Sequence, residues 1–210
     1  MVAEIPSALP DQTISTAPGM SLSYLGYSFE VPWVDIDQAS VQTRNNTAVI
    51  PFRSGATIVL MRHSPGEMLE VLEKPSPTEM HRRLCALYGD YGCESDYQLM
   101  NLAFATRPDE LGWFTPRDKD ARGLALLTLK MIYITDPSGL FSIETKEFKG
   151  FQIGDITKGK RRAVDDLYSD GGKVEFVFGG KPTQGGAISQ PEINRVLQTL
   201  HKISAAPTAN

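Results

Sequence analysis

The sequence predicts an α+β domain. We expect one antiparallel β-sheet of about six strands, with helices inserted between an N-terminal hairpin and the C-terminal strands. Three observations support this class: strand-like alternation near both ends, helical spacing in the middle, and a capped amphipathic helix that closes the pattern. Regularly alternating βα units, which would indicate a doubly wound parallel sheet, do not occur. At 210 residues the chain is long enough to bury a substantial core.

The first strands are expected in the N-terminal third. Apolar and polar residues alternate over residues 27–31, and Pro32 ends this run because proline has no N–H to donate. Residues 48–61 contain a β-branched apolar run that fits a strand buried on both faces, with Gly55 as a kink. We expect these two segments to pair as an antiparallel hairpin.

The middle of the chain has helical spacing. Residues 76–79, Ser-Pro-Thr-Glu, form a capping box with proline at the first helical position, so a helix is expected to begin there. A third helix is expected from residues 115–118 onward, with a strand over residues 126–135 as the alternative. The second helix, from about residue 95, has one apolar face. That face consists of Tyr97, Met100 and Phe104.

The last third returns to strands. Four segments have strand patterns, and residues 169–172 supply the glycines of a tight hairpin turn. These segments are residues 140–145, 148–154, 163–168 and 173–178. Ser189, Pro191 and Glu192 then cap a helix whose apolar stripe is expected to pack on the sheet. The stripe consists of Ile193, Val196, Leu197, Leu200 and Ile203.

Composition sets the expected domain limits. Residues 1–20 and 204–210 are small and polar without periodicity, so both ends are expected to be flexible tails around a single domain at 21–203. The chain is expected to be a monomer or a weak oligomer.

Charge and cysteine content restrict the partners and the compartment. The net charge of −4 gives no general attraction to nucleic acid, and no apolar run reaches the roughly 20 residues that cross a bilayer. No signal peptide begins the chain, so we expect either a cytoplasmic protein or an exported one whose targeting segment has been removed. Cys85 and Cys93 flank a turn between two predicted helices. The spacing is compatible with a disulfide that joins these helices in an oxidising compartment and equally with two buried thiols.

One dense basic cluster stands out in this acidic chain. Residues 154–161 match the glycines and the lysine of a P-loop, but Arg161 stands where Ser or Thr must reach the magnesium ion. A basic turn between two strands is the simpler interpretation, and no cofactor is expected. The basic tip, defined as Lys158, Lys160, Arg161 and Arg162, is therefore predicted to dock an acidic protein partner if it has a function.

A complete catalytic set is not visible in the sequence. The three histidines lie far apart and belong to no HExxH or Cys-His signature, and GxSxG does not occur. The leading hypothesis is therefore a noncatalytic binding or accessory domain that acts through protein–protein contact. The alternative is a small-molecule-binding protein or enzyme whose site combines distant residues. The candidates for that site are Asp35, Asp37, Arg62 and His63.

An aromatic residue completes the candidate partner surface. Trp33 directly follows the strand-forming residues 26–32, and aromatic side chains with a polar tip favour interfaces as well as core edges. This glycine, aromatic strand, proline and tryptophan opening, together with the terminal helix over residues 189–203, resembles the PsbP-like family of α+β domains. The resemblance covers about a fifth of the chain, and it implies a noncatalytic accessory or protein-binding domain with no active-site residue to carry over.

Overall fold

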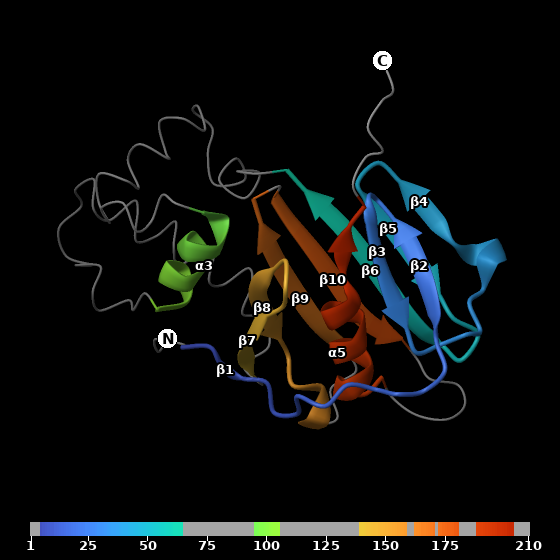
Figure 1. Ribbon diagram of the computed structural model, residues 1–210, viewed down its shortest axis with the longest axis horizontal. Helices are drawn as coiled ribbons and strands as arrows, with labels where there is room; N and C mark the ends of the chain where they lie inside the picture. The colour runs from blue at the N-terminus through green and yellow to red at the C-terminus, as the bar shows by residue number, and fades with distance from the viewer. Residues whose placement is uncertain are drawn as a thin grey trace, which may run out of the picture.

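Two β-sheets form the frame of the molecule in the computed structural model. The structure describes residues 5–64, 95–105, 139–158, 162–170, 172–180 and 188–203. Within these ranges the larger sheet has eight strands, in the order β1-β7-β8-β9-β10-β6-β5-β4, and the smaller one has three, in the order β11-β3-β2 (Figure 1). The larger sheet consists of β1 (Ser7–Ala8), β4 (Gln42–Arg44), β5 (Thr47–Pro51), β6 (Ala56–His63), β7 (Leu140–Glu144), β8 (Lys149–Ile153), β9 (Arg162–Ser169) and β10 (Gly172–Gly180). The smaller sheet consists of β2 (Met20–Tyr24), β3 (Tyr27–Val31) and β11 (His201–Lys202).

The α+β class is confirmed, but the predicted sheet of about six antiparallel strands is wrong. The larger sheet has eight strands and is mixed, because β1 runs parallel to β7 while the other neighbours are antiparallel. The two strands at the edges have no pattern that sequence analysis could detect. β1 is two residues long between Pro6 and Pro10, and all three residues of β4 are exposed, so neither shows the alternation of a half-buried strand.

The predicted hairpin between residues 27–31 and 48–61 is also wrong. β3 pairs with β2 through a two-residue turn, in which Leu25 and Gly26 both have positive φ, 54° and 85°. The apolar run at 48–61 is two strands rather than one. β5 and β6 are joined by a tight turn in which Gly55 has a φ of 91° and its N–H donates to the carbonyl of Phe52 over 2.9 Å.

The four C-terminal strand predictions are confirmed within a residue or two. β7, β8, β9 and β10 follow one another as antiparallel neighbours, and β10 joins this half of the sheet to β6. Gly172, with a φ of 108°, lies at the turn between β9 and β10, where the sequence predicts glycine. Two short 3-10 turns, η1 (Gln38–Ser40) and η4 (Ile156–Lys158), lie in the connections before β4 and after β8.

The helix α3 (Asp96–Ala105) packs on one face of the larger sheet. Its predicted apolar face is confirmed: Met100 and Phe104 are fully buried, and the ring of Tyr97 stacks on Phe151 of β8 with centroids 5.0 Å apart. Phe104 meets the same ring edge-on at 5.1 Å. The helices predicted from residues 76 and 115, and both cysteines, lie outside the described residues.

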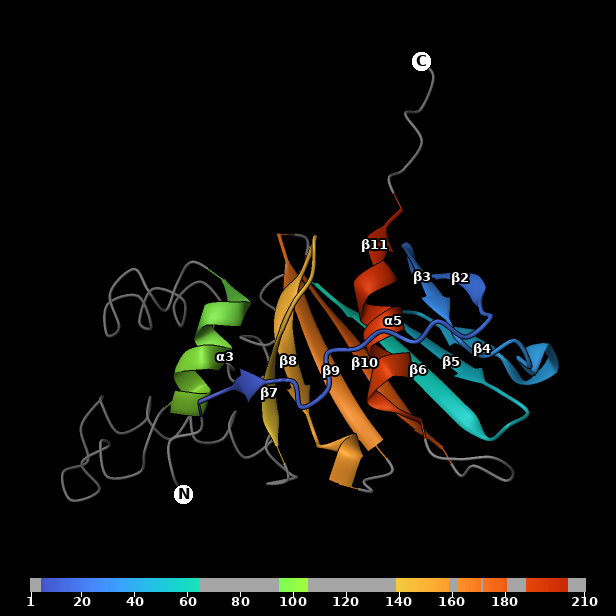
Figure 2. The ribbon, with the colours of Figure 1, turned by 60° about the horizontal axis from the view of Figure 1, so that its bottom comes forward.

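The helix α5 (Gln190–Thr199) covers the opposite face, beside the small sheet (Figure 2). The predicted capping box is present. The main-chain N–H of Ser189 donates to the Glu192 carboxylate, and the Ser189 side chain accepts from the main-chain N–H of Glu192. The helix is shorter than predicted, however. Leu200 is extended, and the next two residues form β11 against β3, which leaves Ile203 48% exposed outside the apolar stripe.

The core between α5 and the sheets is a single apolar cluster. Ile193, Val196 and Leu197 of α5 are almost completely buried in it. Phe29 of β3 meets Phe176 of β10 edge-on with ring centroids 5.3 Å apart, so the small sheet packs directly on the large one.

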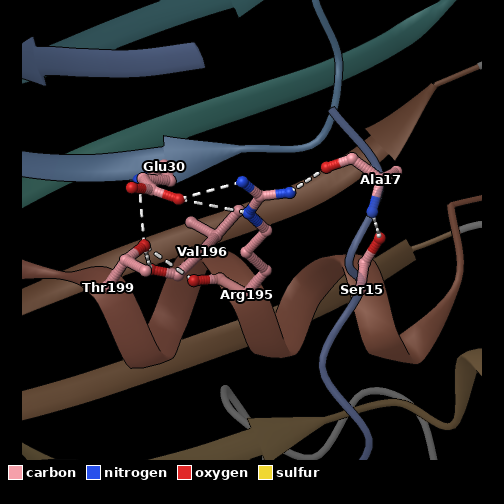
Figure 3. Close-up of polar contacts among 6 residues, drawn as sticks. All are labelled: Ser15, Ala17, Glu30, Arg195, Val196 and Thr199. Atoms are coloured by element: carbon pink, nitrogen blue, oxygen red, sulfur yellow. Dashed lines mark hydrogen bonds and ion pairs between the residues drawn. The ribbon is translucent and has the colours of Figure 1, made fainter. Parts of the chain in front are cut away.

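The N-terminal segment, predicted to be a flexible tail, runs along α5. The side-chain amide of Asn194 donates to the carbonyls of Asp11 and Thr13 over 2.9 and 2.7 Å. Figure 3 shows the next attachment, where the Arg195 guanidinium bridges the Glu30 carboxylate, 3.0 Å away, and the carbonyl of Ala17. The composition of this segment gives no sign of these contacts, because they are made to its main chain.

Replacing Ile193 or Leu197 by Ala is expected to lower the free energy of unfolding by about 2–5 kcal/mol, because each change leaves a cavity in the core. Urea unfolding measures the effect. Gln198→Ala, on the exposed side of the same helix, is the matched control and should change it by less than about 0.5 kcal/mol. Equal small effects at all three positions would contradict the packing of α5.

Candidate binding surfaces and buried polar clusters

The basic tip lies in the connection between β8 and β9. Lys158 ends η4 with its side chain 68% exposed, and its Nζ is 3.2 Å from the Asp155 carboxylate. Arg162 is exposed at the start of β9, and the described residues include no acidic side chain paired with it. Lys160 and Arg161 lie outside the described residues. The structure therefore places the two ends of the tip at the surface.

Asp155 anchors the near end of this connection. Its carboxylate accepts a hydrogen bond from the main-chain N–H of Thr157 over 3.0 Å, and it also bonds the Thr157 hydroxyl. Burial opposes its ionisation, but the hydrogen bonds from Thr157 and Lys158 outweigh that effect and lower the pKa of Asp155. Asp155 is therefore a charged anchor for η4, and it compensates part of the charge of Lys158.

Trp33 lies at the start of α5. Its indole N–H donates to the Glu192 carboxylate over 3.0 Å, and its ring packs on Phe52 with centroids 5.2 Å apart. The end of β8 reaches the same helix start, because Gln152 bonds both the carbonyl of Gly154 and the side chain of Gln190. Trp33, through Glu192, and the end of β8, through Gln152, thus both contact the first turn of α5.

The four residues of the alternative enzyme site do not converge. Asp35 accepts a hydrogen bond from the N–H of Ser54 over 2.6 Å, and the N–H of Asp37 donates to the carbonyl of Pro51. Both positions are at the turn that precedes β6, whereas Arg62 and His63 end that strand. At about 3.3 Å per residue, the eight residues of β6 separate the two pairs by roughly 25 Å.

His63 belongs instead to a buried ionic cluster on the face of the sheet that carries α3. The Nζ of Lys173 is 3.1 Å from the Asp166 carboxylate and 2.9 Å from that of Glu175. The Nε2 of His63 is 3.6 Å from the same Glu175 oxygen. The pairing of β6, β10 and β9 places these four residues side by side. No pattern in the sequence signals this cluster, because its members become neighbours only through strand pairing across 110 residues of chain.

The environment of the ionic cluster shifts the pKa values of its two carboxyl groups in opposite directions. Burial raises the pKa of Asp166 and the charge of Glu175 adds to the rise, although Lys173 counteracts it. Burial would also raise the pKa of Glu175, but His63 and Lys173 outweigh it and lower that pKa to about 2. Glu175 is therefore the carboxylate that holds the negative charge beside Lys173.

A second polar group is buried on the opposite face of the sheet. The amides of Gln152 and Gln190 bond each other reciprocally over 2.8 and 2.7 Å, and Gln190 also donates to Asn194 over 3.0 Å. Asp165 pairs with Gln152 in the strand register and is fully buried, and neither of its carboxyl oxygens has a hydrogen-bond partner. Burial, assisted by the neighbouring Asp166, raises the pKa of Asp165 well above its ordinary value.

A cavity of about 280 Å³ lies between the N-terminal segment, β7 and α5. We call it the edge cavity. Apolar side chains and amides both line it. Its lining residues are Ala8, Leu9, Gln12, Ser142, Ile143, Glu144, Asn194, Leu197 and Gln198.

Comparison with known proteins assigns no relative: no protein-family model matches the chain, and no curated protein matches it. Two further findings concern the described part of the chain. It contains no helix long and apolar enough to cross a membrane. It also contains no group of three or more His, Cys, Asp or Glu side chains arranged to hold a metal ion.

Replacing Asp165 by Asn is expected to flatten the pH dependence of stability. A carboxyl group with a raised pKa stabilises the fold fully below its unfolded value of 3.8, and that contribution is lost as the pH rises toward the folded pKa. The unchanged protein should therefore lose up to about 1 kcal/mol per pH unit relative to the variant above pH 4. Urea unfolding at pH 4.5, 6 and 8 measures this, and parallel curves for both proteins would contradict it.

Proposed function

We propose that this chain is a noncatalytic binding domain and that the basic tip docks an acidic surface of a partner protein. The observation that carries the proposal is the exposure of Lys158 and Arg162 at the two ends of one connection. The sequence between them adds Lys160 and Arg161. Four cations therefore occur within five consecutive residues of a chain whose net charge is −4.

Electrostatics favours a protein partner for such a tip. Asp155 compensates one of the four cations, which leaves a local excess of positive charge against an acidic background. Exposed charges attract a complementary surface over about 8–10 Å at ordinary salt, and they act mainly by raising the association rate. The acidic background opposes binding to a long polyanion such as nucleic acid, whereas a compact acidic patch contacts the tip alone.

Trp33 extends the same docking face. It lies at the start of α5, which the β8 end of the basic connection also reaches through Gln152 and Gln190. A half-buried indole on this side of the molecule adds apolar contact to the charge attraction of the tip, a combination that interface centres commonly use. The resemblance to the PsbP-like family implies the same class of function. The rival enzyme hypothesis loses support, because its four residues lie at the two ends of β6.

Changing Lys158, Lys160, Arg161 and Arg162 together to Gln is expected to abolish most binding to an acidic probe. A fluorescein-labelled peptide of ten glutamates serves as the probe, and fluorescence anisotropy at 50 mM salt measures its dissociation constant. We expect at least a tenfold weakening, because the attraction comes from these four charges. Binding by the unchanged protein should weaken steeply between 50 and 300 mM salt.

A control variant with the same change in net charge separates the effect of the position of the cations from the effect of net charge. Arg44, Arg53, Lys146 and Lys202 are exposed elsewhere, and changing all four to Gln should leave probe binding within about twofold. Equal weakening by both quadruple variants would show attraction by net charge alone, and it would overturn the docking role of the tip. Melting temperatures of both variants should stay within a few degrees of the unchanged protein.

A further inference from the structure

The ionic cluster of Lys173, Asp166, Glu175 and His63 lies deeper than a surface ion pair. The side chains of Lys173 and Asp166 are only 1% and 2% exposed. Those of Glu175 and His63 are 15% and 25% exposed, so the cluster meets the surface on their side. Buried ions are costly to desolvate. A reaction that removes the charges of Lys173 and Asp166 together would remove that cost.

The antiparallel pairing of β9 with β10 holds these two groups together. Glu175 lies directly opposite Asp166, and Lys173 lies opposite Tyr168. The Lys173 side chain therefore reaches diagonally across the strands, and its Nζ is 3.1 Å from an oxygen of the Asp166 carboxyl group. Well-oriented groups held about 3–3.5 Å apart react as if present at roughly 10⁵–10⁸ M. The strand pairing thus supplies proximity for attack of an amine on a carboxyl group.

Aromatic side chains pack beside the cluster on the β8 side. Phe151 lies opposite Asp166 in the register of β8 and β9, and it is 1% exposed. The rings of Tyr97 and Tyr168 both pack on the Phe151 ring, with centroids 5.0 and 6.1 Å away. Water is the second product when an amine and a carboxyl group form an amide. Because the packed rings exclude water, these surroundings disfavour hydrolysis of an amide formed there.

The two carboxyl groups suit different parts of such a reaction. Burial raises the pKa of Asp166 to about 6, so its protonated form, which an amine can attack, is accessible near neutral pH. Burial opposes the ionisation of Glu175, but His63 and Lys173 outweigh it and lower the pKa of Glu175 to about 2. Glu175 lies 2.9 Å from the Lys173 amine and 3.6 Å from the His63 ring. It is therefore placed to carry protons between the amine and the more exposed imidazole.

From this geometry we propose that Lys173 and Asp166 become joined by an intramolecular isopeptide bond, with Glu175 as the group that carries the protons. The Lys173 ammonium gives a proton to the Glu175 carboxylate, and the neutral amine attacks Cγ of protonated Asp166 to form a C–N bond. The C–OH bond then breaks, the hydroxyl leaves as water with the proton from Glu175, and the nitrogen gives its surplus proton back to Glu175. The products are one amide and one water molecule, and no oxidant or reductant takes part. The bond does not depend on the function of the basic tip.

Peptide mapping of the unchanged full chain tests the bond directly. The purified chain is denatured, digested with trypsin and analysed by mass spectrometry. Trypsin requires a free lysine amine, so we expect no cleavage after Lys173, and the uncut peptide that contains Asp166 should be lighter by about 18 Da, the mass of one water molecule. Fragment ions from backbone breaks between residues 166 and 173 should be missing, because the bond closes this stretch into a ring. Normal cleavage after Lys173 together with an unreduced mass would overturn the proposal.

The same map distinguishes the isopeptide bond from other losses of water. Asp170 precedes a glycine, and an aspartate in that position can cyclise to a succinimide with the same change in mass. Trypsin would then still cleave after Lys173, and that result would overturn the proposal. Lys149 and Glu144 are an internal control, because they pair across β7 and β8 at 3.5 Å but are 63% and 74% exposed. This exposed pair should remain unlinked, and a link there would overturn the requirement for a buried cluster.

Two matched variants test the part assigned to Glu175. Glu175→Gln keeps the size of the side chain but cannot accept the proton, so the linked fraction of the protein should fall at least tenfold. Asp165→Asn changes a buried carboxyl group on the opposite face of the sheet, and it should leave the linked fraction within about twofold. Equal linked fractions in both variants would overturn the role of Glu175. The map of the unchanged chain decides whether the bond exists even if Glu175→Gln does not fold.

Discussion

Burial of one face of α5 holds the two sheets in a single structure. The helix presents Ile193, Val196 and Leu197 to a core that the large and small sheets share, and Phe29 and Phe176 join those sheets directly. Each fully buried apolar side chain of this size contributes roughly 1.5–3 kcal/mol. In the described part of the chain the small sheet has three strands, so it has little core of its own and depends on this shared one.

The polar side of α5 organises the segments around it. Gln190 reaches into the large sheet, Asn194 holds the N-terminal segment, and Arg195 joins that segment to β3. The amides of Gln190 and Asn194 donate to buried or half-buried oxygens, which would otherwise cost free energy. The Arg195 guanidinium pairs with the Glu30 carboxylate and with an exposed carbonyl. One ten-residue helix thus contacts the edge cavity, the indole of Trp33 and the N-terminal segment, and holds all three in place.

Sequence patterns predicted those elements whose structure depends on residues close in the chain. The capping box at Ser189 and the glycine turn at Gly172 were sufficient to place α5 and the β9–β10 hairpin, because both involve residues close in sequence. The pairing of β2 with β3 was missed because its turn places Leu25 at positive φ, for which leucine carries no signal. The end of α5 was placed too late, because the apolar stripe continues through Leu200 after the backbone has become extended.

The candidate sites also differ in whether residues close in sequence or residues far apart in sequence form them. The exposed ends of the basic tip were predictable, because a dense run of cations is solvated wherever the strands place it. The ionic cluster around Lys173 and the buried Asp165 were not predictable. A charged residue is expected at the surface until the pairing of distant strands is known. The edge cavity escaped detection for a related reason, since its walls come from three segments far apart in the chain.

The order of elements along the chain has a consequence for synthesis on the ribosome. All the described strands of the large sheet precede α5, so they are synthesised while the face that buries Phe176 and Phe178 still lacks its helix. A chain without α5 would present a broad aromatic and aliphatic surface, of the kind that general chaperones bind and that promotes aggregation. The core closes only when α5 packs on this face, so the helix that completes the core is made after all the described strands of the large sheet.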